Sequence, residues 1–166
     1  MSREQILEHI VAYARSHGQY DISLLRDGFE LMHLHRMIEQ LSEENLADRG
    51  INLRLVEILE CLYHHPAGVM TPADLSDEVN LSRSAMTSAL DSLEKLGYAQ
   101  RRPHPCDRRM FEVSLTDTGR SFTAELLPDR YAKFIRIMKE TGEEERTLLL
   151  RTYRKIFKVL QTELAK

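Results

Sequence analysis

The sequence predicts a mainly α-helical fold with a small β wing, and three observations lead to this fold class. Apolar residues recur at helical spacing along most of the 166 residues, and with only 7 Gly and 5 Pro the chain has few helix breakers. Near the middle of the chain, two short helix signals follow each other within about three residues. Two segments of alternating character come next and flank a charged tip, which is typical of a β hairpin.

Composition and length limit the classes of protein to consider. Hydrophobic residues make up 42% of the chain, which is enough for a real core. No apolar run approaches the ~18 residues that would span a bilayer, and the N-terminus does not have the apolar stretch of a signal peptide. We therefore expect a cytoplasmic protein without a membrane partner. Cys61 and Cys106 show no disulfide or zinc-ligand spacing, and the adjacent histidines do not share a helix face, so we expect neither a metal nor another cofactor.

Three helices are expected before the first proline. Ser2 and Gln5 have the spacing of a capping box, and apolar residues follow at helical spacing. A second, longer helix is predicted over residues 22–46, where the apolar stripe has a period near 3.6. Asn52 is placed to cap a third helix, which must end before Pro66.

The densest signals follow this proline. Thr71-Pro72 combines an N-cap threonine with a proline at the first helical position, and it predicts a short helix to Val79. Ser82 can cap the next helix, which Gly97 should end. The apolar face of that helix consists of Ala85, Met86, Ala89, Leu90, Leu93 and Leu96. Two short helices so close together predict a helix-turn-helix.

Residues 98–102 and 111–115 alternate in the manner of strands, and they flank residues 103–109, which we expect to lie outside the strands. Such a hairpin is the wing of a winged helix-turn-helix, and we place this domain at residues 50–120. Thr116 to Gly119 should start another helix, with Pro128 as its expected kink.

The terminal segments, residues 1–49 and 121–166, are expected to form a helical dimerisation region. A last helix is predicted from Glu143, where acidic residues favour a helix N-terminus. The apolar stripes of these segments exceed what one small domain can cover. We therefore expect a homodimer.

The charge distribution favours a polyanionic partner, although the net charge is −3. Residues 82–109 contain more basic than acidic side chains, and the rest of the chain is acidic. A basic island on an acidic body suits a protein that presents one face to DNA. The charged residues of this island are Arg83, Lys95, Arg101, Arg102, Arg108 and Arg109, with Asp91, Glu94 and Asp107 as the acids.

The second helix of the helix-turn-helix has a polar face formed by Arg83, Ser84, Thr87, Ser88 and Asp91. Small hydroxyl residues beside an arginine let a helix enter a major groove and offer donors and acceptors to base edges. An ordinary solvated helix face carries the same residue types, and the hairpin that follows favours the DNA-binding interpretation.

Four arginines fall at the ends of the hairpin, where the negative potential of a narrow minor groove would attract them. They are Arg101, Arg102, Arg108 and Arg109. Asp107 lies two residues before Arg109, so its carboxylate can accept a hydrogen bond from that guanidinium and orient it.

Residues from about Ile51 to Arg120 resemble the MarR (multiple antibiotic resistance regulator) family. The resemblance rests on the run LSRSAMTSALDSLEKLGYAQRRPHPCDRRMFEVSLTDTGR, above all on LEKLG, DRR and LTDTG within it. It implies a homodimeric DNA-binding regulator, in many cases a repressor that a small ligand or oxidation releases. Within the family, Gly50-Ile51-Asn52 and Leu127-Pro128 are similar to the multidrug-efflux repressor branch.

The resemblance also implies roles for individual residues. Arg109 would enter the minor groove, steadied by Asp107. An aromatic or lipophilic acid in the cleft between the dimerisation helices and the reading domain would be the effector, with Arg15, His33 and Met37 as candidate lining residues. The major groove or its phosphates would be contacted by Ser82, Arg83, Ser84, Thr87 and Ser88.

Other function classes stay open at this point. The sequence contains no Gly-rich phosphate loop, nucleophile elbow or His-Glu-x-x-His motif, so we expect no enzyme and no catalytic residues. A redox-responsive regulator that uses Cys106, or a winged-helix module that contacts only proteins, are the alternatives. Salt-sensitive retention on DNA would separate a DNA-binding regulator from an enzyme or a protein-only module.

Overall fold

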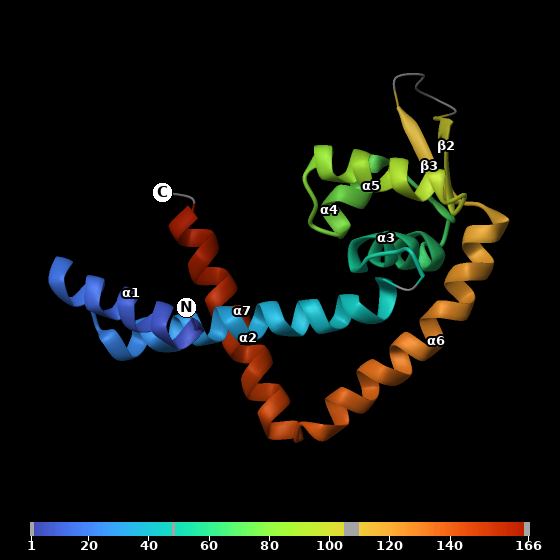
Figure 1. Cartoon of the computed structure of the whole chain (residues 1–166). Coiled ribbons are helices and arrows are strands. Elements are labelled where there is room, and N and C mark those ends of the chain that lie inside the picture. Colours follow the sequence, from blue (N-terminus) through green and yellow to red (C-terminus); the bar gives the residue numbers. More distant parts are fainter. Residues whose placement is uncertain (1, 48, 105–109, 165–166) are drawn as a thin grey trace. The chain divides into compact units, whose positions relative to one another are not determined.

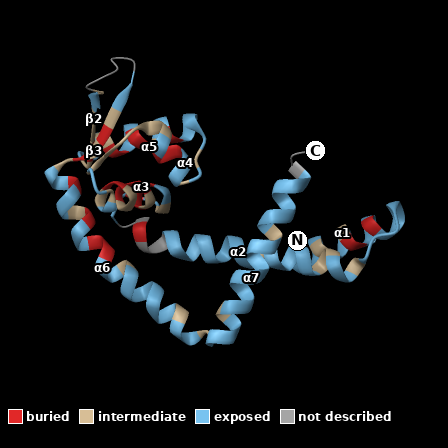
Figure 2. Ribbon diagram, turned by 180° about the vertical axis from the view of Figure 1, so that it is seen from behind, coloured by how far each residue is buried: buried red, intermediate tan, exposed pale blue. Residues whose placement is uncertain are grey.

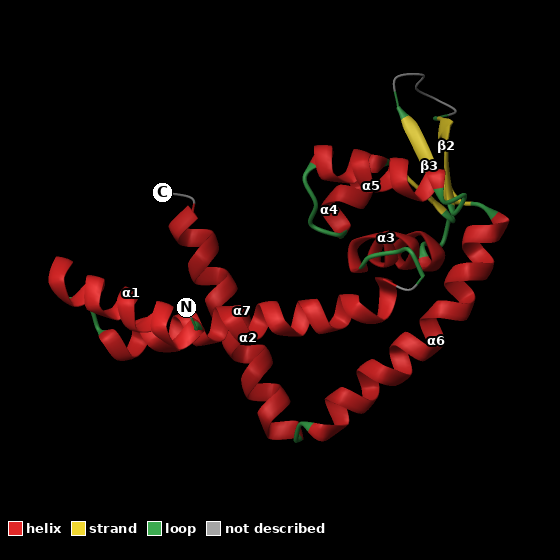
Figure 3. Cartoon of the chain, viewed as in Figure 1, coloured by secondary structure: helices red, strands yellow, loops and turns green. Residues whose placement is uncertain are grey.

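The structure is a computed structural model that describes residues 2–47, 49–104 and 110–164 (Figure 1). Helices dominate it, and its strands form one small antiparallel sheet, as Figure 3 shows. The contacts divide the chain into two compact units, Met1–Val56 and Glu57–Lys166. Each unit is described on its own below.

The first unit contains α1 (Arg3–His17), α2 (Ile22–Ala47) and the start of α3 (Leu53–His64). The predicted capping box is present, because the Gln5 amide donates to Ser2 Oγ at 3.2 Å and the Ser2 amide donates to Gln5 Oε1 at 2.7 Å. The side chain of Asp21 caps α2 by accepting from the backbone of Ser23 at 2.9 Å. Val11 is buried where α1 packs on α2.

The core of the second unit lies under the helix-turn-helix, where Figure 2 shows buried residues on α3, α4 and α5. Eight large apolar side chains in this core are at most 1% exposed, so each has exchanged nearly all of its water contact for packing. These side chains are Ile58, Leu59, Leu62, Leu75, Met86, Leu90, Leu93 and Val113.

Local capping sets the ends of α4 (Pro72–Glu78) and α5 (Arg83–Lys95) as predicted. The Ser82 hydroxyl accepts from the Ala85 amide at 3.2 Å, and Asn80 in the turn between the helices has φ +52°. Gly97 follows α5 with φ +75°, a conformation that only glycine adopts without cost. The next amide, that of Tyr98, donates back to the Leu93 carbonyl at 2.9 Å and closes the helix end.

Three strands form the sheet in the order β1-β3-β2, with β1 (Val69–Met70), β2 (Ala99–Pro103) and β3 (Phe111–Leu115). The sequence analysis missed β1, which is two residues long and therefore carries no alternation. The expectation that Pro103 lies outside the strands was wrong, because Pro103 pairs with Phe111 at the end of β2. A proline is tolerated there since β2 is an edge strand.

After the wing, the chain continues as α6 (Asp117–Glu140) and α7 (Glu143–Leu164). Thr116 caps α6 as predicted, with its hydroxyl 2.9 Å from the Gly119 amide, and Pro128 lies inside a helix that continues to Glu140. Among the described residues, no helix has the length and apolar character needed to cross a membrane.

Candidate nucleic-acid interface

Helix α5 places polar and apolar residues on opposite sides, as the sequence predicts. Met86, Leu90 and Leu93 are buried in the core, and this fixes the rotation of the helix about its axis. Ser84, Thr87 and Ser88 are exposed as a consequence. The polar face is thus held rigidly by the apolar face, as an element that reads base edges requires.

The hydroxyl groups of this polar face bond to their own helix. Thr87 Oγ1 donates to the Arg83 carbonyl at 3.0 Å, and Ser88 Oγ donates to the Ser84 carbonyl at 3.2 Å. These bonds keep the side chains close to the helix axis, so the face is narrow. The lone pairs of both hydroxyls stay available to donors outside the protein.

Arg83 connects the two helices of the helix-turn-helix. Its guanidinium lies 3.1 Å from a carboxylate oxygen of Asp77, and it also donates to the backbone carbonyl of Ala73. Both residues belong to α4. The side chain of Arg83 is 60% exposed, so a phosphate oxygen can still approach it.

Arg101 occupies a different environment from Arg102, the other wing arginine that the structure describes. It lies in β2, and its Nη1 is 2.6 Å from Asp91 Oδ1 and 2.7 Å from Glu94 Oε2. The guanidinium also donates to the Thr87 carbonyl at 3.1 Å. The sequence grouped Arg101 with the other arginines at the ends of the hairpin and gave no sign of its pairing with Glu94, although both residues were counted in the basic island.

Arg102 is exposed on β2, with a hydrogen bond of 3.2 Å to Gln100 Oε1. It is therefore the described wing arginine that best fits a contact with a phosphate. The other residues expected at the tip, Cys106, Asp107, Arg108 and Arg109, lie outside the described residues.

A second polar cluster, unforeseen from the sequence, joins α3 to α6. The Tyr131 hydroxyl donates to Glu60 Oε1 at 2.7 Å, and His64 Nε2 lies 2.9 Å from the same hydroxyl. Since the tyrosine proton is used on Glu60, the histidine must be the donor in the second bond. Desolvation and the Glu60 hydrogen bond raise the pKa of Tyr131 to about 12, against the influence of Arg130.

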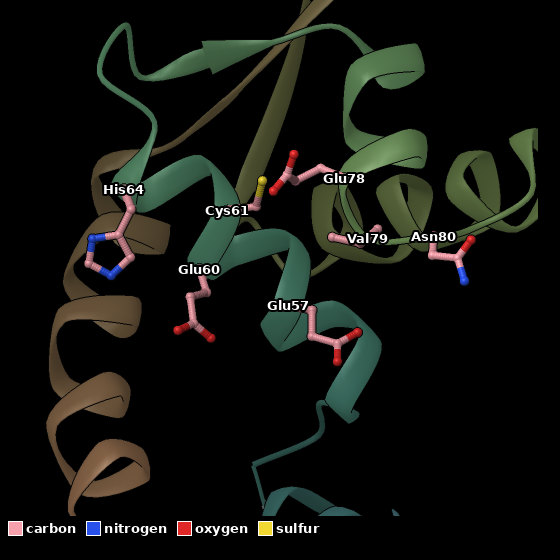
Figure 4. Close-up of a pocket in the computed structure, with 7 residues that line it drawn as sticks. All are labelled: Glu57, Glu60, Cys61, His64, Glu78, Val79 and Asn80. Carbon is pink, nitrogen blue, oxygen red and sulfur yellow. The ribbon is translucent and has the colours of Figure 1, made fainter. Parts of the chain in front are cut away.

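Glu60 and His64 also line a cavity of about 470 Å³ between α3 and the turn after α4 (Figure 4). Three carboxylates face this space, so it is electrostatically unsuited to an acid. The expected effector residues lie elsewhere: Arg15 and Met37 are exposed, and His33 is half-buried. The residues that line the cavity are Glu57, Glu60, Cys61, His64, Glu78, Val79 and Asn80.

Cys61 is half-buried in this cavity, and its Sγ lies 3.5 Å from Met70 Sδ. Burial, followed by the charges of Glu78 and Glu60, raises the pKa of this thiol. The thiol form therefore dominates at neutral pH, where only the thiolate is reactive. No group of three or more His, Cys, Asp or Glu is placed to hold a metal in the part of the chain that the structure describes.

Sequence comparisons place the chain among transcriptional regulators. The model of the MarR family matches residues 51–111. The chain is 24% identical to the HTH-type transcriptional repressor YetL of Bacillus subtilis over 153 residues, which cover 92% of both proteins. It is 33% identical to the uncharacterized HTH-type transcriptional regulator YwhA of the same organism, over 67% of this chain and 78% of YwhA.

Solved structures show the same fold. AbsC, a MarR family transcriptional regulator from Streptomyces coelicolor, has a TM-score of 0.77 at 20% identity, over 87% of this chain and 99% of AbsC. S. aureus MepR, solved as a DNA complex, has a TM-score of 0.71 at 18% identity, over 86% and 99%. Bordetella bronchiseptica BpsR, whose DNA binding is regulated by 6-hydroxynicotinic acid, has a TM-score of 0.66 at 17% identity, over 79% and 98%.

Proposed function

Because the chain belongs to the MarR family of DNA-binding transcription regulators, we propose that it is a homodimeric repressor that binds a pseudo-palindromic operator and responds to a small ligand. Its relatives are regulators and not enzymes. The proposal includes a cytoplasmic location, where the operator DNA is found.

One observation carries the DNA-binding part of the proposal: α5 exposes Ser84, Thr87 and Ser88 while its opposite side is locked into the core. In this role Thr87 and Ser88 face base edges, which small side chains can reach without holding the helix away from the groove. Ser82 and Arg83, at the N-terminus of α5, contact phosphates, where the helix dipole favours an anion. We assign Arg102 to the phosphates as well.

The tip of the wing is assigned by sequence alone. We propose that Arg108 and Arg109 reach the minor groove and that the Asp107 carboxylate orients Arg109. Replacing Arg109 with alanine should weaken operator binding by about 1–3 kcal/mol with little change in thermal stability, because a wing-tip side chain contributes little to folding.

We propose the dimer because a single chain leaves the apolar surface of α7 exposed. Seven large apolar side chains of α7 are 40% to 60% exposed, and Figure 2 shows the helix as almost entirely exposed. An apolar surface of this extent favours a second copy as its cover. The seven side chains are Leu148, Leu149, Leu150, Tyr153, Phe157, Val159 and Leu160.

Sedimentation of the full chain tests the dimer. We expect a dimer at micromolar concentration, and monomers after removal of residues 1–20 and 145–166. A two-fold dimer would place its two α5 helices in successive major grooves, which requires half-sites roughly 34–36 Å apart. A full-length chain that sediments as a monomer would contradict this arrangement.

Selection of bound duplexes from a random DNA pool tests sequence-specific binding. The parent should enrich a pseudo-palindrome. Thr87→Ala should change the preferred half-site, because it removes a base contact, whereas Arg102→Ala should weaken binding to all sequences alike and reduce the salt dependence. An unchanged half-site for Thr87→Ala would show that another face of α5 reads the bases.

The ligand response is proposed from the regulation of BpsR by an aromatic acid. In this chain, Arg15 is the candidate partner for a carboxylate, with His33 and Met37 of α2 beside the ring. Titration with 6-hydroxynicotinic acid as the probe should release the parent from its selected duplex, and Arg15→Met should weaken this response. DNA binding that stays unchanged throughout the titration would exclude this class of effector.

A further inference from the structure

Arg101 ties the first strand of the wing to the helix that carries the base-reading residues. Its guanidinium bonds to Asp91 at 2.6 Å and Glu94 at 2.7 Å, both on α5. The backbone amide of Arg101 also donates to Glu94 Oε1 at 2.8 Å, so Glu94 holds both the main chain and the side chain of Arg101. The third guanidinium bond, 3.1 Å long, ends on the carbonyl of Thr87 itself.

The guanidinium of Arg101 is poorly placed for a phosphate. Its side chain is only 22% exposed, and three of its bonds already use donors on both terminal nitrogens. A phosphate would have to displace two carboxylates that hold the side chain in place. Arg102, the next residue, is exposed and has neither carboxylate as a partner in the described structure.

Asp91 explains why an arginine is needed at this position. Its carboxylate is 61% exposed and stands one helical turn after Thr87, on the same face of α5. An unpaired carboxylate at this place would repel the phosphates that flank a major groove. Arg101 places one positive charge 2.6 Å from Asp91 and 2.7 Å from Glu94, and so offsets part of the negative charge of the two carboxylates.

We propose that Arg101 is a positioning residue for DNA recognition: it fixes the wing against α5 at Thr87 and offsets the negative charge of Asp91 and Glu94, and it makes no phosphate contact of its own. This role rests on the proposed function. It replaces the sequence-based expectation that Arg101 is a DNA contact like Arg102.

A double-mutant cycle between Arg101 and Asp91 tests this role. The probe is the duplex selected with the parent, and the readouts are its Kd over a series of salt concentrations and the thermal unfolding of each variant. Arg101→Met should weaken binding at least fivefold. Asp91→Asn should improve the Kd of the parent less than it improves the Kd of Arg101→Met, because in the parent Arg101 offsets part of the negative charge at that carboxylate.

The decisive variant is the double mutant. In the Arg101→Met background, Asp91→Asn should recover binding at least threefold, because it removes the more exposed of the two carboxylates that lost the guanidinium. The slope of log K against log salt should stay near the parent's for Arg101→Met, whereas Arg102→Met, the matched control, should reduce it by about 0.9. Arg101→Gln, which keeps donors for the Thr87 carbonyl, takes the place of Arg101→Met in the cycle if the latter does not fold.

The possible outcomes distinguish a failure of the positioning role of Arg101 from a failure of the proposed function. Suppose that the parent selects a duplex, that the fold-changes in Kd of Arg101→Met and Asp91→Asn simply multiply in the double mutant, and that Arg101→Met lowers the salt slope as Arg102→Met does. Arg101 is then a direct phosphate contact, and the positioning role is overturned. If the parent selects no duplex and shows no salt-dependent retention on DNA, the proposed function fails, and the role of Arg101 fails with it.

Discussion

Replacing Gly119 with alanine tests the joint that connects the wing to α6. Thr116, which caps α6, donates its backbone amide to the Tyr98 carbonyl at 3.0 Å and its hydroxyl to the Gly97 carbonyl at 2.6 Å. These bonds bring the first turn of α6 against the residues that follow α5. Gly119 lies at the point of closest approach, because a Cβ there would stand 1.9 Å from the Tyr98 carbonyl oxygen.

The size of the effect follows from this geometry. A carbon and an oxygen atom that are not bonded stay at least about 3 Å apart, so the backbone of Tyr98 and the first turn of α6 must separate by about 1 Å. Overpacking of this kind costs about 1–3 kcal/mol. Loss of the hydrogen bond from the Thr116 amide adds about 1 kcal/mol. We therefore expect Gly119→Ala to lower the free energy of unfolding by about 2–4 kcal/mol.

Thermal and urea unfolding measure this loss, which corresponds to a fall of roughly 5–15 °C in Tm. Gly28→Ala is the matched control, since Gly28 lies inside α2 with nothing within 4 Å of its added Cβ. That variant should gain about 0.5–1 kcal/mol, because alanine is the better helix former. A Gly119→Ala protein as stable as the parent would show that the close approach at Tyr98 is not a feature of the folded protein.

Three further predictions follow from single groups. The pKa of Tyr131, raised to about 12, should appear in an ultraviolet titration, and Glu60→Gln should lower it; an unaltered titration in Glu60→Gln would contradict the assignment. The stability linked to this raised pKa is complete below pH 10 and is lost as the pH rises through 12. In a Cys106→Ser background, Cys61 should react with iodoacetamide more slowly at pH 8 than a free cysteine does, because its raised pKa reduces the thiolate fraction. Equal reaction rates would contradict the raised pKa. Asn80→Gly should leave the free energy of unfolding nearly unchanged, whereas Asn80→Val should lower it by about 1–2 kcal/mol because Asn80 has a positive φ. Similar free energies for the two variants in urea unfolding would exclude strain in the turn.

The helices of the chain were accessible to sequence analysis because their signals are local. A cap such as Ser82 acts on an amide three residues away, and an apolar stripe repeats within one or two turns. The starts of α1, α4, α5 and α6 were therefore predicted correctly, and so was the pairing of the wing strands. The short strand β1 was missed because its existence depends on β3, which lies more than 40 residues further along the chain.

The candidate DNA-binding residues were predicted as a set, but their individual environments were not. The sequence places Ser84, Thr87 and Ser88 on one face of α5 through periodicity alone, and the structure exposes all three. Charge counting treats Arg101 and Arg102 as equivalent neighbours. They differ because successive side chains of a strand point to opposite sides, and one side of β2 lies against α5.

The sequence by itself thus determined the family, the order of the helices, the capping residues and the polar face of α5, since each depends on residues close together in the chain. Only the tertiary structure decided which charges are paired and which close approaches exclude a side chain. Arg101 meets Asp91 and Glu94, Tyr131 meets Glu60 across 71 positions of the chain, and Gly119 meets Tyr98. The physical reason is that short-range bonds need atoms within about 3 Å, and the packing of whole elements determines which distant residues come that close.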